Sequence, residues 1–325
     1  MSQATNITIA DPAGIEDQPG RSLWSDALHR LMRSPAAVIC FSIIVVYALV
    51  AIITPLVVGD WQTLSDYDNI NAAPSWNHPL GTDSLGRSIL IKTMLGAHVS
   101  MTVAFLANAI AIPVGMILGA LAGYFGKRID DLVVWMYTTL ASIPGIIRLI
   151  AIKFAFTGII LFEYAKIELP FTGRSIDLSI DLSGMAGIII ALGVMSWIGT
   201  CRLVRAEVMK LRETDYVMAA RAAGRGNLSI LFRHIIPNVL HIGIINFSLG
   251  FVGAISAEVI LSYLNLGVQD LPSWGKMINS ARMDLVVGRW TEIGAAVTAT
   301  FVIILAWNIF GDRLRDALDP RLRNE

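Results

Sequence analysis

Six long apolar stretches constrain this chain more than any other feature of its sequence. Each holds about 20 residues rich in Ile, Val, Leu and Ala, the length that a helix needs to cross the hydrocarbon core of a bilayer. The stretches are 37–58, 99–123, 131–152, 185–206, 239–262 and 291–311. Residues are 55% hydrophobic and only 15% charged, which is unusual for a soluble domain. The sequence therefore predicts an all-α polytopic membrane protein with about six transmembrane helices.

Two of these stretches carry features that bear on how the helices are shaped and packed. Gly115, Gly119 and Gly123 recur every four residues in the second stretch, a spacing that lets neighbouring helices approach closely. The third stretch continues as apolar sequence to about Phe162 and contains Ser-Ile-Pro-Gly at 142–145. It is too long for one untilted helix, and its proline makes a kink at this point the expected outcome.

The Lys and Arg residues between the stretches favour one orientation. If the N-terminus is cytoplasmic, sixteen of them lie inside, namely Arg21, Arg30, Arg33, Lys127, Arg128, Arg202, Arg205, Lys210, Arg212, Arg221, Arg225, Arg233, Arg313, Arg315, Arg321 and Arg323. Seven lie outside, namely Arg87, Lys92, Lys166, Arg174, Lys276, Arg282 and Arg289. Because cytoplasmic loops carry the excess of Lys and Arg, both termini and the loop 207–238 are predicted to be cytoplasmic.

The segments that flank the first stretch have distinct characters. Residues 1–20 are polar and read as a disordered cytoplasmic tail, residues 59–96 as an extracytoplasmic loop and residues 313–325 as a second cytoplasmic tail. Residues 21–36 are predicted to form an amphipathic helix on the membrane surface, with an apolar face made of Leu23, Trp24, Ala27, Leu28, Leu31 and Met32. Ser22 is a plausible N-cap. The alternative for this segment is an ordinary solvated linker helix.

The loop 207–238 carries the most position-specific pattern in the chain. Asp215 to Ala223 is rich in alanine and predicts a short helix, which Gly224 is placed to end. Asn227 is placed to cap a second short helix over 228–234, ahead of Pro237. Such a pair of helices is expected to form a compact protrusion. Its alanines allow close approach to a groove on a partner protein, and Arg221 and Arg225 are placed to pair with acidic residues at the rim of that groove. The alternative is an amphipathic interfacial helix without a partner.

This loop resembles the (E)AA-x3-G-x9-I-x-L-P motif of ABC-importer permeases. The match lies at Ala219, Ala220, Gly224 and Pro237. The chain departs from the motif at His234 and Ile236, and at Met218, where the family usually has Glu.

Three further blocks resemble the dipeptide, oligopeptide and nickel permeases of the same class. They are LGTDSLGR at 80–87, EVILSYLNLGV with PSWG at 258–275, and GDRLRDALDPR at 311–321. In the first block, Asp83 or Ser84 is placed to cap a helix beginning near Leu85, with Arg87 at the outer interface. The four blocks cover most of the chain from about Asp68 to Arg323, and on them the chain is identified as a member of this permease family, resembling the C-type peptide permease.

The resemblance implies the type I ABC importer permease fold, with residues 97–312 as the transmembrane domain and a cytoplasmic coupling helix. It also implies a multi-pass protein of the bacterial inner membrane that pairs with a homologous second permease, two ATPase subunits and an extracytoplasmic solute-binding protein. No cofactor is expected on this chain, and ATP and Mg belong to the ATPase partners. Peptides are the implied cargo, with glutathione, nickel chelates and peptide antibiotics as alternatives. The implied docking residues are Tyr216, Ala219, Ala220, Arg221, Ala223, Gly224, Arg225 and Pro237.

Charged residues inside the apolar stretches are costly in a membrane and often functional. Arg148 and Lys153 fall in the third stretch and Glu258 near the outer end of the fifth. At 100° per residue, Arg148 and Lys153 point about 140° apart on one helix. One interpretation makes them a cationic lining of the substrate path, with Glu258 as a partner. The other is that both side chains snorkel to the outer interface.

The segment 163–183 contains an alternating run, SIDLSIDL at 175–182. A period of two predicts a small extracytoplasmic β-ribbon. Such a ribbon is suited to contacting a binding protein, to plugging the outer mouth, or to neither if it is a passive insertion.

Other function classes find little support in the sequence. No GxxxxGK[ST] nucleotide motif, HExxH, GxSxG or paired CxxC is present, and a net charge of zero gives no reason to expect nucleic-acid binding. The positions of Cys40 and Cys201 indicate neither a disulfide framework nor a metal site, and the five histidines are scattered. A self-sufficient secondary transporter, expected to show a midplane ion site in an inverted repeat, and an intramembrane enzyme remain the alternatives from other classes.

Overall fold

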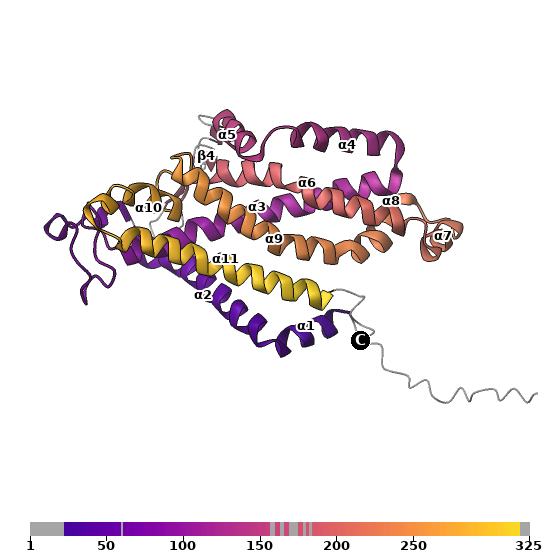
Figure 1. Ribbon diagram of the computed structural model, residues 1–325. Helices are drawn as coiled ribbons and strands as arrows, with labels where there is room; N and C mark the ends of the chain where they lie inside the picture. The colour runs from indigo at the N-terminus through magenta and orange to yellow at the C-terminus, as the bar shows by residue number, and fades with distance from the viewer. Residues whose placement is uncertain are drawn as a thin grey trace, which may run out of the picture.

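A computed structural model describes residues 23–59, 61–156, 160–162, 166–168, 175–177, 180–181 and 184–318. Within these ranges five helices are long and apolar enough to cross a membrane, and a bent pair of helices makes a sixth candidate span. The five are α2 (Pro35–Val58), α3 (Ile89–Phe125), α6 (Met185–Leu211), a continuous run from Asn227 to Tyr263 that ends with α9 (Ile236–Tyr263), and α11 (Thr291–Leu318). The long helices lie side by side in one bundle (Figure 1). The predicted all-α fold with about six spans is confirmed.

The third predicted span is two helices rather than one. They are α4 (Lys127–Ala141) and α5 (Gly145–Phe156), and they are bent by 95° at the break between them. Pro144 lies in that break and has no N–H to continue the α4 hydrogen-bond ladder. The kink expected at 142–145 is therefore present, but it is a sharp break that turns α5 away from the direction of α4 (Figure 1).

Helix α3 begins earlier than the sequence indicates. The prediction left residues up to 96 in a loop and began the span at 99, whereas α3 starts at Ile89 and runs for 37 residues. Two polar side chains, Lys92 and His98, interrupt the apolar pattern, and the first part of the helix was therefore not predicted. Each is satisfied by a partner from elsewhere in the chain: Lys92 by carboxylates, and His98 by the carbonyl of Ala51, 2.8 Å from its Nδ1.

The glycine row of α3 is its contact surface with α6. A Cβ atom built on Gly119 would lie 2.6 Å from the carbonyl oxygen of Cys201, and one on Gly123 would lie 2.7 Å from that of Arg205. Real Cβ atoms do not approach a backbone oxygen so closely, so these positions require glycine. The close packing predicted from the four-residue spacing is confirmed.

Shorter elements occupy the two ends of the bundle. Helix α7 (Asp215–Ala222) lies at one end, which we call the knob end, and α10 (Trp274–Ala281) lies at the other, the α10 end (Figure 1). The remaining short elements are α1 (Leu23–Arg33), α8 (Asn227–Ile230), the π-helical turn η4 (Leu231–Ile235) and the 3-10 helices η2 (Trp61–Leu64), η3 (Tyr67–Asn69) and η5 (Asp284–Val287).

Helix α1 is the helix predicted before the first span. Its last turn carries Arg30 and Arg33, and Ser34 then caps α2 by accepting a hydrogen bond from the N–H of Ala37 at 3.4 Å. Leu28 and Met32 are exposed. The 1–20 tail and the Ser22 cap lie outside the described residues, as do the side chains of residues 23–27.

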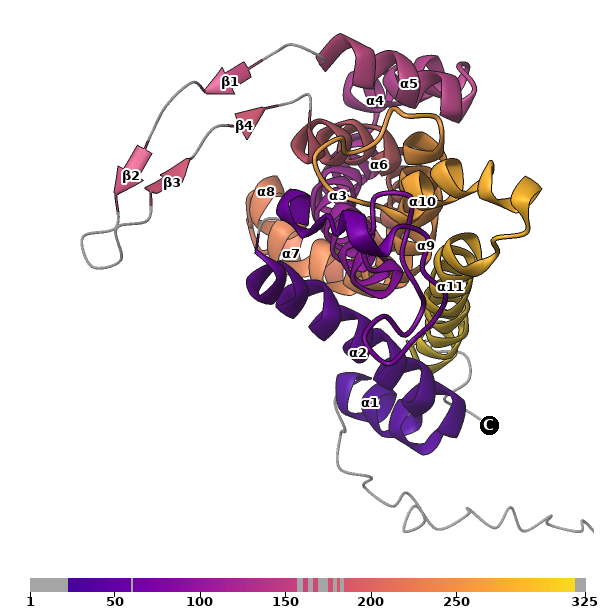
Figure 2. The same ribbon diagram turned by 90° about the vertical axis from the view of Figure 1, so that its left-hand side faces the viewer.

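Four short strands form the β structure expected near 175–182. They are β1 (Ile160–Phe162), β2 (Lys166–Glu168), β3 (Ser175–Asp177) and β4 (Ile180–Asp181), with β1 antiparallel to β4 and β2 antiparallel to β3. Figure 2 shows them reaching away from the helical bundle. The predicted ribbon is present, although the strands at 175–181 pair with strands at 160–168 rather than with each other.

Candidate functional site

The protrusion at the knob end is fixed firmly to the bundle. We call residues 215–235 the knob. Its underside consists of Val217, Ile230, Leu231 and Ile235, all fully buried. These side chains pack in one apolar cluster with the ends of two spans, represented by Ala120 and Tyr124 of α3 and by Val204 and Val208 of α6. A movement of the knob would therefore be transmitted directly to α3 and α6.

The outer surface of the knob is exposed within the described part of the chain. Of the predicted docking residues, all but Ala220 are exposed, namely Tyr216, Ala219, Arg221, Ala223, Gly224 and Arg225 on the knob and Pro237 just beyond it. Three large apolar side chains join them, since Met218, Leu228 and Phe232 are each about half exposed. Ala220 differs from the other docking residues because it is half-buried and packs against the underside.

The turn after α7 is a Schellman motif. The N–H of Gly224 donates to the carbonyl of Arg221 at 3.0 Å, and the N–H of Arg225 donates to the carbonyl of Ala220 at 3.2 Å. Gly224 has φ +75°, a backbone conformation that a residue with a Cβ adopts only with strain. The structure confirms the helix stop predicted at this glycine.

The second part of the knob differs from the prediction. Gly226, not Asn227, is the N-cap residue of α8, and the helix continues without a break through η4 into α9. Pro237 lies in the first turn of α9, just after the π-helical turn. Because proline lacks an N–H and crowds the carbonyl four residues earlier, a widened turn at this point lets the chain continue as a helix. Asn227 instead accepts a hydrogen bond from the Tyr124 hydroxyl at 3.1 Å.

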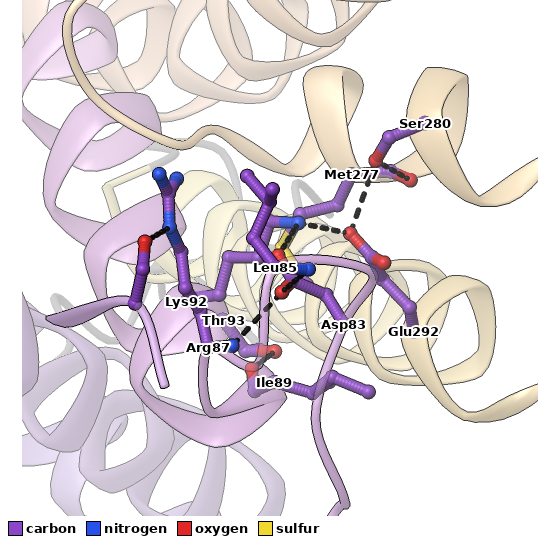
Figure 3. Close-up of polar contacts among 10 residues, drawn as sticks. Asp83, Leu85, Arg87, Ile89, Lys92, Thr93, Met277, Ser280 and Glu292 are labelled. Carbon is purple, nitrogen blue, oxygen red and sulfur yellow. Dashed lines mark hydrogen bonds and ion pairs between the residues drawn. The ribbon is translucent and has the colours of Figure 1, made fainter. Parts of the chain in front are cut away.

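A buried group of charges lies at the α10 end (Figure 3). The Lys92 ammonium on α3 lies 2.8 Å from a carboxylate oxygen of Asp83 and 2.6 Å from one of Glu292, at the start of α11. All three residues are buried. The same Glu292 oxygen accepts a hydrogen bond from the Ser280 hydroxyl of α10 at 3.0 Å. The cluster thus joins the loop before α3 to α3, α10 and α11.

Asp83 organises the loop before α3 but does not cap the helix. One of its carboxylate oxygens accepts hydrogen bonds from the N–H groups of Leu85 and Arg87, both at 2.9 Å, and the other binds Lys92. Burial of the carboxylate opposes its ionisation, yet Lys92 and the two N–H groups hold the pKa of Asp83 below its ordinary value. The capping role expected for Asp83 or Ser84 is wrong, because α3 begins at Ile89.

The three charged residues proposed for a substrate path do not form one group. Glu258 is fully buried on α9, where its two carboxylate oxygens accept hydrogen bonds from the hydroxyls of Ser100 at 2.5 Å and Ser262 at 2.6 Å. Among the described residues it forms no ion pair. The pairing with Arg148 or Lys153 considered from the sequence is therefore not found.

Arg148 and Lys153 both bind backbone carbonyls near α5. A guanidinium nitrogen of Arg148 donates to the carbonyl of Leu140, at the end of α4. Lys153 is buried, and its ammonium donates to the carbonyl of Gly184 at 3.2 Å. These contacts fasten α5 across the break after α4 and onto the start of α6.

Comparison with known proteins agrees with the fold. Residues 111–324 match the family of binding-protein-dependent transport system inner membrane components. The chain belongs to this family. Residues 22–74 also match the N-terminal transmembrane domain of oligopeptide transport permease C. The two matches together cover residues 22–74 and 111–324 of this permease.

Named relatives cover almost the whole permease. A glutathione transport system permease protein from Pectobacterium atrosepticum is 32% identical over 312 residues, which is 95% of each chain. A dipeptide transport system permease protein from Alkalihalophilus pseudofirmus is 33% identical over 304 residues, 93% of this chain and 91% of the relative. An oligopeptide transport system permease protein from Bacillus subtilis is 32% identical over 305 residues, with the same coverage.

Proposed function

We propose that this permease forms half of the transmembrane pathway of an ATP-driven importer for peptides or peptide-like solutes. The knob is the part that couples the pathway to a separate ATPase, which binds the ATP and Mg and carries out the hydrolysis. The observation that carries this proposal is the two-sided construction of the knob. Its underside is fully buried against α3 and α6, while its outer side presents small, apolar and basic side chains that the described chain leaves uncovered.

This construction suits transmission of force from a soluble partner. A docking element must be rigid with respect to the helices that it moves, and the buried contacts of Val217, Ile230 and Leu231 supply that rigidity. It must also admit a close partner, and the exposed faces of Ala219 and Ala223 leave room for one. ATP-driven movement of the knob would then tilt the helices of the bundle between inward-open and outward-open arrangements.

The orientation proposed for the chain places the knob end in the cytoplasm. Helix α1, with Arg30 and Arg33, and the C-terminal part of α11, with Arg313 and Arg315, lie toward the same end as α7 (Figure 1). The positive-inside rule assigns such an end to the cytoplasm. The α10 end and the strands β1–β4 then face the extracytoplasmic side, where a solute-binding protein delivers the cargo.

Membership of the family supports a proposal for the remaining subunits. One permease supplies half of a pathway, so we propose a homologous second permease beside it, two ATPase subunits below them and one solute-binding protein above. The three relatives named above are described as permeases for glutathione, dipeptides and oligopeptides. All of these are peptides, and this shared chemistry supports a peptide or a peptide-like solute as the cargo.

Docking of the ATPase is tested by co-purification. The tagged permease is purified from membranes that contain its ATPase subunits, with Ala219→Arg and Arg221→Glu as variants on the exposed side of α7. Arg315→Glu, exposed in the last turn of α11 at the same end, is the matched control. We expect both α7 variants to lose most of the bound ATPase while the control retains it, with equal amounts of permease in the membrane. Ala220 is less suitable for this test because it is half-buried.

The proposal has two clear ways to fail. Full ATPase association in both α7 variants would show that the knob is not the docking element. Uptake by the purified permease alone, driven by an ion gradient in proteoliposomes, would make it a secondary transporter instead.

A further inference from the structure

A polar pocket of about 530 Å³ opens at the α10 end of the bundle. It lies between the loop that precedes α3 and the segment 265–280, which runs from the end of α9 into α10. Among the described residues, three cationic side chains, Arg87, Lys92 and Lys276, line it together with a single carboxylate, Asp270. Its volume is within the range of sites that hold small molecules.

The three cations are not equivalent. Lys92 is already neutralised by Asp83 and Glu292, both within 2.8 Å. Arg87 and Lys276, in contrast, form no ion pair with any carboxylate in the described part of the chain. The pocket therefore presents two cations that lack a carboxylate partner.

Arg87 is held in a fixed position. Its guanidinium lies over the ring of Trp61, 4.2 Å from the ring centroid, and its Nε donates to the Ser65 hydroxyl at 3.0 Å. These two contacts orient the planar group and use only one of its nitrogens. A guanidinium fixed in this way is suited to two parallel hydrogen bonds with a carboxylate.

Lys276 is half-buried in the first turn of α10, and within the part of the chain that the structure describes its ammonium hydrogen-bonds only to a neutral group. Its ammonium donates to the carbonyl of Gln269 at 2.7 Å. Burial lowers the pKa of Lys276, the charge of Asp270 partly offsets this effect, and the charge of Lys92 adds to it. A bound anion would compensate the Lys276 ammonium for its lost hydration and would offset the repulsion between the ammonium groups of Lys276 and Lys92.

We propose that this pocket binds a zwitterionic solute, with Arg87 and Lys276 receiving its carboxylate and Asp270 receiving its ammonium group. The inference rests on the proposed function, because it gives the imported peptide a first site on the permease itself. Asn265, Gln269 and Asn279 line the same pocket. Their side chains hydrogen-bond within the segment 265–279, and their remaining amide atoms can hydrogen-bond to peptide groups. Asp270 disfavours a doubly charged anion such as phosphate, since it adds a like charge to the site.

Solute binding is measured on the intact transporter in lipid nanodiscs, without the binding protein, by titration calorimetry. The probes are Ala-Ala, its C-terminal amide and its N-acetyl derivative. We expect the amide to bind at least tenfold more weakly than Ala-Ala, because it lacks the carboxylate, and the acetyl derivative to lose affinity as well. Equal binding of Ala-Ala and its amide, or no binding of Ala-Ala at millimolar concentration, would overturn the proposal.

The variant Lys276→Gln assigns the binding to this pocket. Glutamine can still donate to the carbonyl of Gln269 but carries no charge, so the loop should keep its shape. We expect the Kd for Ala-Ala to rise at least fivefold and the Kd for the amide to change little. Arg282→Gln, an exposed cation just beyond α10 that does not line the pocket, is the matched control and should bind as the wild type does. An unchanged Kd in Lys276→Gln would overturn the proposal.

Two further measurements separate this inference from its alternatives. If Lys276→Gln weakens docking of the ligand-free binding protein but leaves Ala-Ala affinity unchanged, the pocket receives a carboxylate of that protein and the solute site is ruled out. ATPase co-purification is measured on the same samples. Retained ATPase with no solute site would contradict only this inference, whereas a solute site in a permease that binds no ATPase would contradict only the proposed coupling.

Discussion

The ammonium of Lys92 and the carboxylate of Glu292 form a buried ion pair 2.6 Å long between residues 200 positions apart in the sequence. The pair connects the first turn of α3 with the first turn of α11, and Asp83 completes it from the loop before α3. Three elements that meet at the α10 end therefore depend on one cation.

Replacing Lys92 by Met should strongly destabilise the permease. The substitution leaves Asp83 and Glu292 buried together without a cation, and removal of one partner from a buried ion pair typically costs about 3–5 kcal/mol. Thermal unfolding of the purified protein measures the effect. Lys210→Met is the control, since it breaks an ion pair with Glu207 whose lysine side chain is 73% exposed and should leave the transition unchanged. Equal unfolding temperatures for Lys92→Met and wild type would contradict a structural role for the cluster.

The contribution of Asp83 should depend on pH in a defined direction. Because the pKa of Asp83 is below its ordinary value of 3.8 in the folded protein, its stabilising effect is complete above that value and is lost as the pH falls through the lower, folded-state pKa. Asp83→Asn should therefore lower the unfolding temperature at pH 7, and the difference from wild type should shrink below about pH 4. A difference that grows toward acid pH would show that the folded carboxylate is not favoured in its ionised form.

The contact between α3 and α6 should tolerate no side chain at Gly119. A Cβ there would meet the carbonyl oxygen of Cys201 at 2.6 Å, so Gly119→Ala must push the two helices apart, at a cost of about 1–3 kcal/mol. Gly199→Ala is the matched control, because it lies on α6 with no atom within 4 Å of the added Cβ. The fraction of folded protein recovered from membranes compares the two variants. Similar recovery would mean that this helix contact relaxes more easily than the structure indicates.

The sequence predicted what depends on local pattern and missed what depends on tertiary pairing. Apolar length indicated the spans, the four-residue glycine spacing indicated the α3 contact face, and Gly224 marked the end of α7. The start of α3 was missed because Lys92 counts as a polar residue until its two carboxylate partners are known. Those partners come from a loop and from a helix 200 positions away, and no local pattern connects them.

The pathway residues show the same limit. Intramembrane charge drew attention to Glu258, but spacing along the chain did not reveal that Ser100 of α3 and Ser262 of α9 bind it. Pro144 likewise predicted that the chain bends after α4, but it did not predict how large the bend is, 95°. The polar pocket at the α10 end escaped notice because its lining is assembled from two segments about 180 residues apart, 61–92 and 265–280.

Substitution of Glu258 should affect folding more than substrate selection. Its carboxylate is fully buried and binds two serine hydroxyls, so Glu258→Ala leaves a cavity and unpaired hydroxyl groups and should lower the amount of permease in the membrane severalfold. Glu258→Gln keeps the shape and an oxygen acceptor and should restore most of it. Arg148→Leu, on α5, provides the comparison: loss of uptake at normal abundance would place Arg148 in the pathway, and normal uptake would exclude it. Altered peptide preference in Glu258→Gln at normal abundance would contradict a purely structural role for Glu258.

Met218→Glu should weaken docking of the ATPase without affecting the fold. Met218 is 47% exposed on α7, while its neighbour Val217 points into the buried underside of the knob. The importer-permease motif that this loop resembles has Glu at the corresponding position, so this permease presents an apolar side chain where that motif has a charge. If its own ATPase is matched to the methionine, burying a carboxylate against an apolar surface should weaken association about tenfold, since an uncompensated buried charge is costly. The affinity of the purified ATPase for the permease in nanodiscs measures this effect, with Met218→Leu as the apolar control. Tighter binding by Met218→Glu would show instead that the ATPase retains a site for the usual glutamate and that Met218 is a weakened form of the family contact.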